Sequence, residues 1–215
     1  MKIFLSLLAL FALLAGGAWY YFDSTMHYLP PDVETMQEVR PEDFHQQARQ
    51  IKKRMSRELK AGGQTSVSAG DIEKITFAAI ARKSKIPPEE LIKRYKVDIQ
   101  PGGVRLSALV DLRKVRQLRL PAKMRTALET VTGFIPDDML DEVYVSVNGL
   151  PQKVGDKVAF SDDARVQIGG WSRKLNDLMD DARIILGRDI FQKLSFNTIR
   201  IEKDRVIIKR QDNRP

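Results

Sequence analysis

The hydrophobic positions of this chain fall into three patterns, and each predicts a different kind of element. Residues Ile3 to Phe22 form one apolar run of about twenty residues, the length at which an α-helix crosses a bilayer core. From Phe44 to Leu59 the apolar residues recur at steps of three and four, which predicts an amphipathic helix. From Lys96 onward the period is mostly two, as in half-buried strands. The pattern therefore predicts one N-terminal transmembrane helix followed by a single α+β domain.

The apolar run leaves two interpretations open. Ala15 to Ala18 supplies small residues where a signal peptidase cuts, whereas the aromatic cluster from Trp19 to Phe22 suits the headgroup boundary of a retained helix. Lys2 precedes the run and Asp23 follows it, so the positive-inside rule places the N-terminus in the cytoplasm. Residues 1–22 are expected to be a single-pass anchor of the inner membrane or a signal segment, and the domain is expected to be periplasmic.

Three segments follow the apolar run. Residues 23–40 contain Pro30-Pro31 and few periodic apolar positions, which predicts a spacer. Residues 41–62 are expected to be an amphipathic helix that Pro41 opens and Gly62-Gly63 ends. Its basic side suits a membrane surface, and its apolar stripe also suits packing on its own domain. Residues 63–215 are expected to be the exported α+β domain.

Within that domain, Ser68 and Asp71 form a variant of the capping box, which predicts a helix that runs to about Ser84. A hairpin is then expected from Lys96 to Leu112, with one buried face and one mostly wet face, and its second strand is expected to continue raggedly to Leu120. Asn148-Gly149 is a strong turn signal. The further expected elements are strands at 142–147, 157–160, 165–168, 196–202 and 205–210, and helices at 121–131 and 172–186, with a break at Gly169-Gly170.

Composition narrows the class of protein. The chain has 215 residues, no cysteine and a formal net charge of +8. An exported domain without cysteine has no disulfides, so its hydrophobic core alone must hold it together. The positive charge favours anionic partners, of which acidic lipid headgroups suit an exported domain better than nucleic acid does. No nucleic-acid partner is expected.

Candidate chemistry is sparse. The two histidines, His27 and His45, have no second ligand at metal-binding spacing, so no metal site is expected. Adjacent carboxylates at Asp137-Asp138, Asp162-Asp163 and Asp180-Asp181 diverge on a strand or helix and do not converge on one substrate. The sequence therefore predicts a protein that is not an enzyme, with no cofactor and no catalytic residue.

The order of these elements resembles that of bacterial single-domain tubular lipid-binding (TULIP-like) proteins. The resemblance rests on four stretches: VSAGDIEKITFAAIA, VDIQPGGVRLSALVDL, VYVSVNGLPQKVGDKVAF and FNTIRIEKDRVIIKR. It spans about residues 67–210 and leaves out the 41–62 helix. It implies a strongly curved antiparallel sheet, a half barrel, packed on one or two helices so that an apolar groove remains for acyl chains.

The expected function is a membrane-anchored lipid-binding or lipid-transfer protein of the bacterial cell envelope. Burial of each acyl methylene in an apolar groove is worth about 0.8 kcal/mol. The alternative is a non-enzymatic scaffold subunit of an envelope protein complex, with the apolar face closed by packing. The expected groove residues are Ile72, Ile75, Ala79, Val104, Leu106, Ala108, Val110, Val143, Val145, Val147, Val166, Ile168, Leu175, Leu178 and Met179.

Overall fold

A computed structural model describes residues 24–25, 28–83, 86–116, 140–154, 157–175, 185–186 and 198–210. It confirms an α+β protein with an antiparallel six-stranded sheet and helices. The helices are η1 (Pro31–Thr35), α2 (Phe44–Gly62), α3 (Ala69–Lys83), α4 (Pro88–Leu91) and α5 (Leu112–Val115). The strands are β1 (Gln37–Glu38), β2 (Gln64–Ser68), β3 (Ile92–Gln100), β4 (Gly103–Val110), β5 (Val143–Gly149), β6 (Pro151–Val154), β7 (Lys157–Phe160), β8 (Arg165–Ile168), β9 (Trp171–Lys174), β10 (Ile185–Leu186), β11 (Thr198–Glu202) and β12 (Arg205–Lys209).

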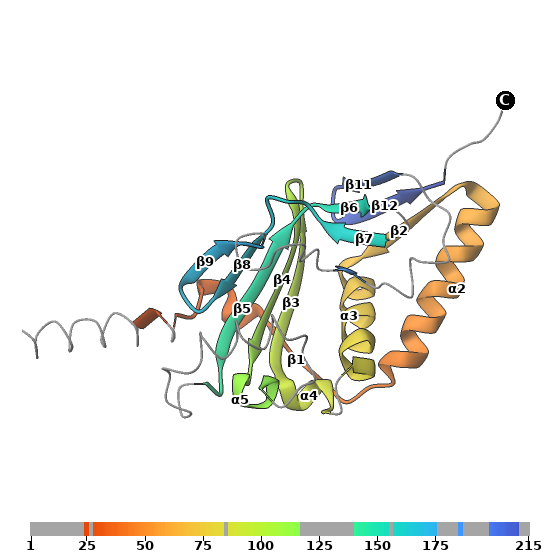
Figure 1. The fold of residues 1–215 in the computed structure, drawn as a ribbon. Coiled ribbons are helices and arrows are strands. Elements are labelled where there is room, and N and C mark those ends of the chain that lie inside the picture. Colours follow the sequence, from red (N-terminus) through yellow and green to blue (C-terminus); the bar gives the residue numbers. More distant parts are fainter. Residues whose placement is uncertain are drawn as a thin grey trace, which may run out of the picture.

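The large sheet has the strand order β1-β3-β4-β5-β8-β9, and every neighbouring pair is antiparallel. Two smaller sheets, β10-β7-β6 and β11-β12-β2, lie at one end of it (Figure 1). Helix α3 lies beside the large sheet, and α2 lies beyond α3 on the side away from the sheet (Figure 1). Because α3 has the sheet on one side and α2 on the other, it needs apolar residues on more than one face.

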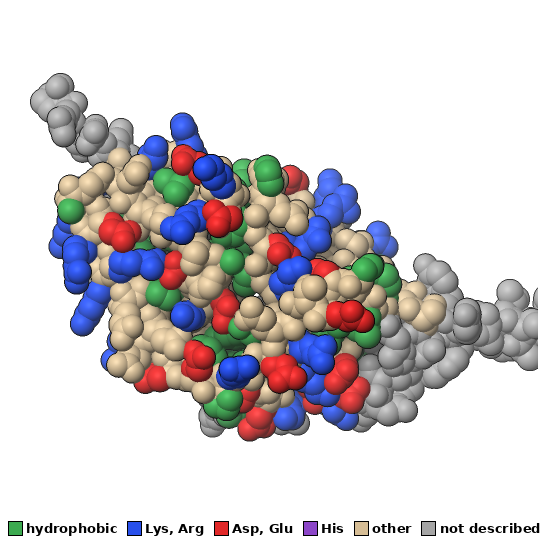
Figure 2. Space-filling view, turned by 180° about the vertical axis from the view of Figure 1, so that it is seen from behind, with side chains coloured by type: hydrophobic (Ala, Val, Ile, Leu, Met, Phe, Trp, Pro, Cys, Tyr) green, Lys and Arg blue, Asp and Glu red, His purple; other side chains and the backbone are tan. Residues whose placement is uncertain are grey.

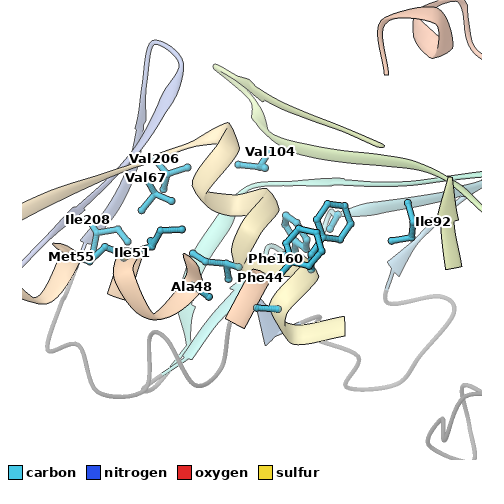
Figure 3. Packing of buried hydrophobic residues seen from close by; sticks show 14 of the residues in the cluster. Phe44, Ala48, Ile51, Met55, Val67, Ile92, Val104, Phe160, Val206 and Ile208 are labelled. Carbon is cyan, nitrogen blue, oxygen red and sulfur yellow. The ribbon is translucent and has the colours of Figure 1, made fainter. Parts of the chain in front are cut away.

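The predicted amphipathic helix is confirmed as α2. It begins at Phe44 rather than near Pro41, because the side chain of Asp43 caps it by accepting a hydrogen bond from the amide of Gln46 at 2.9 Å. It ends where Gly63 adopts a left-handed conformation (φ 68°). All five stripe residues are buried in the protein's own core, so this stripe does not face a membrane: Phe44, Ala48, Ile51, Met55 and Leu59. Figure 3 shows the first four of them within the core.

The predicted capping box is also confirmed. The amide and hydroxyl of Ser68 both donate to the carboxylate of Asp71 at 2.9 Å, and the amide of Asp71 donates to the hydroxyl of Ser68 at 3.2 Å. Arg54 on α2 donates to the same carboxylate at 2.7 Å. One side chain therefore caps α3 and links it to α2 and β2.

The Lys96–Leu112 hairpin is confirmed as β3 and β4, but the turn predicted at Asn148-Gly149 is wrong. Strand β5 runs through Gly149 and pairs with β4 and β8, while β6 joins a different sheet. The glycine is needed for close packing, because a Cβ there would lie 2.7 Å from the Cβ of Ala164. The ragged extension of β4 past Leu112 is also wrong, since Asp111 caps the short helix α5.

Two further predictions are corrected. Gly169-Gly170 does not break the sheet but turns the chain between β8 and β9, with Gly169 at φ 57°. Ser172 lies in β9 and therefore does not cap a helix, because Trp171–Lys174 pairs with β8 and extends the sheet. The segment expected as a spacer contains η1 and β1, and β1 pairs with β3.

Other predictions lie outside the described residues. These are the transmembrane segment 1–22, the helix at 121–131 and most of the helix at 172–186. Among the residues that the structure does describe, no helix has both the length and the apolar character needed to span a membrane.

Candidate functional site

One face of the large sheet is apolar across β3, β4, β5 and β8 and continues on β9 with Trp171 and the exposed Arg173, and we call it the inner face. The pairing register aligns Val97, Leu106, Val147 and Val166 in one row across β3, β4, β5 and β8. The next row aligns Tyr95, Ala108, Val145 and Ile168 and ends at Trp171 on β9. Because alternate residues of a strand share a face, the period-two pattern produces this surface.

The inner face contains most of the predicted groove residues. Val104, Val143, Ile75 and Leu175 are buried, as core packing requires. The remaining described groove residues are all half-buried: Ile72, Ala79, Leu106, Ala108, Val110, Val145, Val147, Val166 and Ile168. Leu178 and Met179 lie outside the described residues. The sheet thus carries a continuous apolar surface that is only partly covered.

The opposite face, which we call the outer face, is not the mostly wet surface that the alternation predicted. Ser107 and Leu109 are buried on it. Leu109 packs with Met36 and Tyr144, and the hydroxyls of Ser107 and Tyr144 lie 3.1 Å apart. The polypeptide before α2 folds back over this face, which local sequence alternation does not reveal.

A cleft of about 830 Å³ opens at the β3 edge of the inner face, between residues 35–44, the start of α3 and β3. Its volume lies within the range of about 300–1,000 Å³ that is typical of small-molecule sites. Phe77 stands between two other aromatic rings, 5.1 Å from Phe44 and 4.8 Å from Tyr95 between ring centroids. Charged side chains, among them Arg40 and Lys74, also line the cleft, so it combines apolar and ionic surfaces.

Two titratable groups in this cleft have shifted pKa values. The hydroxyl of Tyr95 donates to the carboxylate of Glu73 at 2.6 Å. Burial raises the pKa of Glu73 above its usual range, although the bond from Tyr95 opposes the shift. Burial and the neighbouring carboxylate raise the pKa of Tyr95. The phenol therefore stays protonated near neutral pH and serves as a hydrogen-bond donor.

Sequence reasoning missed the aromatic part of this cleft. Phe77 is not among the groove residues expected on the Ser68 helix, and Tyr95 precedes the hairpin expected from Lys96. The sequence does contain a signal for Tyr95. Strand β3 begins at Ile92, and the alternation of Tyr95, Val97 and Ile99 places the tyrosine on the inner face. No cluster of His, Cys, Asp or Glu suited to a metal occurs among the described residues.

Charge is distributed unevenly over the surface. Figure 2 shows Lys and Arg side chains gathered along the edge of the molecule where α2 lies. Elsewhere on that side, basic and acidic side chains alternate, and apolar side chains are visible between them (Figure 2). Lys and Arg side chains therefore gather at the edge formed by α2, whose apolar stripe is buried.

Comparisons with protein-family models, with curated proteins and with solved structures find no match for this chain.

Proposed function

We propose that this protein binds lipid acyl chains on the inner face of its large sheet, as a membrane-anchored lipid-binding or lipid-transfer protein of the cell envelope. The observation that carries the proposal is the half-buried apolar surface over the middle of β4, β5 and β8, between the buried Val104 and Val143. A surface of this kind has an unfavourable hydration free energy, and an acyl chain that covers it gains about 25 cal/mol for each Å² removed from water.

The edge of this surface suits an amphipathic ligand. Tyr95 and Val97 belong both to the inner-face rows and to the cleft beside α3. The cleft is lined by the basic residues Arg40, Lys74 and Lys96 and also by the acidic residues Glu38, Glu42 and Glu73, so it offers charges of both signs to a lipid headgroup. A lipid with its acyl chain along the rows and its headgroup at the cleft satisfies both kinds of surface.

The proposal includes a strongly curved, TULIP-like half barrel and an inner-membrane anchor at residues 1–22. A retained anchor holds the sheet close to the bilayer from which lipid is taken. Val33 of η1 and Met36 pack on the outer face, and β1 pairs with β3 at the edge of the sheet, so this part of the chain before α2 does not cross the middle of the inner face.

Site-specific photo-cross-linking in cells tests the proposal on the full chain. A benzophenone amino acid replaces Leu106 on the inner face or, as the control, the exposed Arg200 on β11, which belongs to neither face of the large sheet. We expect lipid adducts at position 106, detected by mass spectrometry, at several times their yield at position 200.

Two outcomes contradict lipid binding. Equal lipid yields at both positions indicate only proximity to the membrane. Protein adducts without lipid at position 106 favour the alternative function, a scaffold subunit whose apolar face is covered by an envelope protein.

A further inference from the structure

The outer face has a second cleft, of about 520 Å³, between β4, β5, β8 and residues 28–32. Arg105, Asn148 and Arg165 lie in one row across three neighbouring strands, because Asn148 pairs in register with both arginines. Neighbouring strands are about 4.8 Å apart, so the two arginine backbones are about 10 Å apart and their long side chains reach a common point.

Among the described residues, neither the Arg105 nor the Arg165 guanidinium has a hydrogen bond or an ion pair. Asp98 lies in register with Arg105 but forms its ion pair with Lys96 at 3.7 Å. Asp32, which lines the cleft, also pairs with Lys96 at 3.7 Å.

Polar groups surround the arginines. Ser146 is 6% exposed and lines the cleft beside Asn148, and Ser172 lines it from β9. Gln167 also lines it, with its amide nitrogen donating to the carbonyl of Gly169 at 2.8 Å. Hydroxyl and amide donors therefore accompany two unpaired guanidinium groups in a concave site.

We propose that this outer-face cleft is a binding site for a phosphoryl group. A guanidinium presents paired N–H donors that match phosphate oxygens, and two of them on either side of an amide can hold several oxygens of one tetrahedral anion. The site lies on the face opposite the apolar rows, so it goes beyond the proposed lipid-binding function and does not depend on it. Its ligand is either a phospholipid headgroup or a soluble phosphate ester.

Calorimetric titration of the full chain in nonionic detergent, at fixed ionic strength, tests the site. The probes are inorganic phosphate and dihexanoyl phosphatidic acid below its micelle concentration. We expect saturable binding of at least one probe. Tighter binding of the short-chain lipid by tenfold or more assigns the site to a headgroup, and equal or tighter binding of phosphate assigns it to soluble phosphates.

Variants distinguish binding by the cleft arginines from nonspecific attraction to the protein's net positive charge. The double variant Arg105→Gln/Arg165→Gln is expected to weaken binding by about tenfold or more, because charge-assisted hydrogen bonds are lost. The control Lys53→Gln/Arg57→Gln removes the same charge from exposed positions on α2 and is expected to leave binding unchanged. Arg105→Lys keeps the charge but loses the paired donors, and it is expected to weaken binding severalfold.

Three results overturn the proposal: no binding of either probe, equal weakening by the two double variants, or full affinity in Arg105→Gln/Arg165→Gln. Thermal unfolding of each variant without ligand checks that it is folded. If the double variant unfolds, Arg105→Lys alone decides the question, since unchanged affinity in that variant contradicts a guanidinium site.

Discussion

Two apolar surfaces of this molecule differ in their degree of closure. The core between α2, α3 and the β2-β12 strands is closed: Met55 is 0% exposed, Ile208 1% and Val67 2%. The inner-face rows on β4, β5 and β8 are equally apolar. On β4, however, the inward-pointing residues from Leu106 to Val110 are only half-buried. The difference shows that an apolar face is closed only where another element reaches it.

The helices explain this difference. Helix α2 covers α3 and β2, and α3 contacts β3, the strand next to the sheet edge. The described helices contact the central strands β4 and β5 less than they contact β3, because α3 packs mainly on α2, β3 and β2. The described helices thus contact the inner face at its β3 side, where Tyr95, Val97 and Ile99 are nevertheless half-buried, as Val166 and Ile168 are on β8.

The largest expected effect is in the closed core. Met55→Ala removes a fully buried side chain and is expected to lower the free energy of unfolding by about 2–5 kcal/mol. Val147→Ala on the half-buried face is expected to cost less than about 1 kcal/mol, because less apolar area is lost from contact. Urea denaturation of both variants measures the contrast, and equal costs would show that the inner face is closed.

The second effect concerns the link between the helices. Asp71→Asn weakens the cap of α3 and the bond from Arg54 and is expected to cost about 1–2 kcal/mol at pH 7. Burial opposes ionisation of Asp71, but hydrogen bonds from Arg54 and Ser68 outweigh it and lower the pKa. The stabilisation is therefore present above the ordinary pKa and is lost as pH falls through the lowered value.

Denaturation at several pH values, with Asp163→Asn as an exposed control, measures this dependence. A deficit of the Asp71→Asn variant that stays constant down to pH 2 would contradict the assignment.

The third effect tests whether the inner face is open. Ala108 is a small residue in the middle of an inner-face row, and Ala108→Trp fills space above the sheet. If the face is open, the free energy of unfolding changes by less than about 1 kcal/mol while lipid cross-linking at position 106 falls. A closed face instead predicts a loss of about 1–3 kcal/mol from overpacking. Unchanged cross-linking in a stable variant would place the lipid elsewhere.

The smallest effect lies in the cleft at the sheet edge. The pKa of Glu73 is raised, so the folded state favours its protonated form, and the stability from this preference is lost as pH rises through the raised value. Glu73→Gln mimics the protonated group and is expected to make stability less dependent on pH between 4 and 7. Thermal unfolding across this range measures the change, and Glu89→Gln on α4 is the control.

Local patterns predicted a large part of this fold. Steps of three and four identified α2, the Ser68–Asp71 pair identified the start of α3, and alternation identified β4, β5, β8 and β12. These signals depend on residues close in sequence, whose geometry follows from helix and strand periods. The groove residues from Val104 to Ile168 came from the same alternation and do lie on one face.

The errors have a common physical cause. Asn148-Gly149 has the residues of a tight turn, but Gly149 is required by the distant Ala164. Ser172 has a capping side chain, but pairing with β8 makes its segment a strand. The segment before α2 lacks periodicity, yet Met36 is buried against Leu109 and Tyr144. In each case contacts between distant residues outweighed a local preference.

By itself, the sequence determined the elements that depend on spacing along the chain: the α2 stripe, the α3 cap and the apolar alternation of the sheet. Only the tertiary structure decided which apolar surface is closed, and it alone aligned Arg105 with Arg165 across Asn148. Periodicity specifies which side of an element is apolar, because that depends on backbone geometry. Coverage and cross-strand alignment depend on where distant segments pack, which the pattern within one element does not encode.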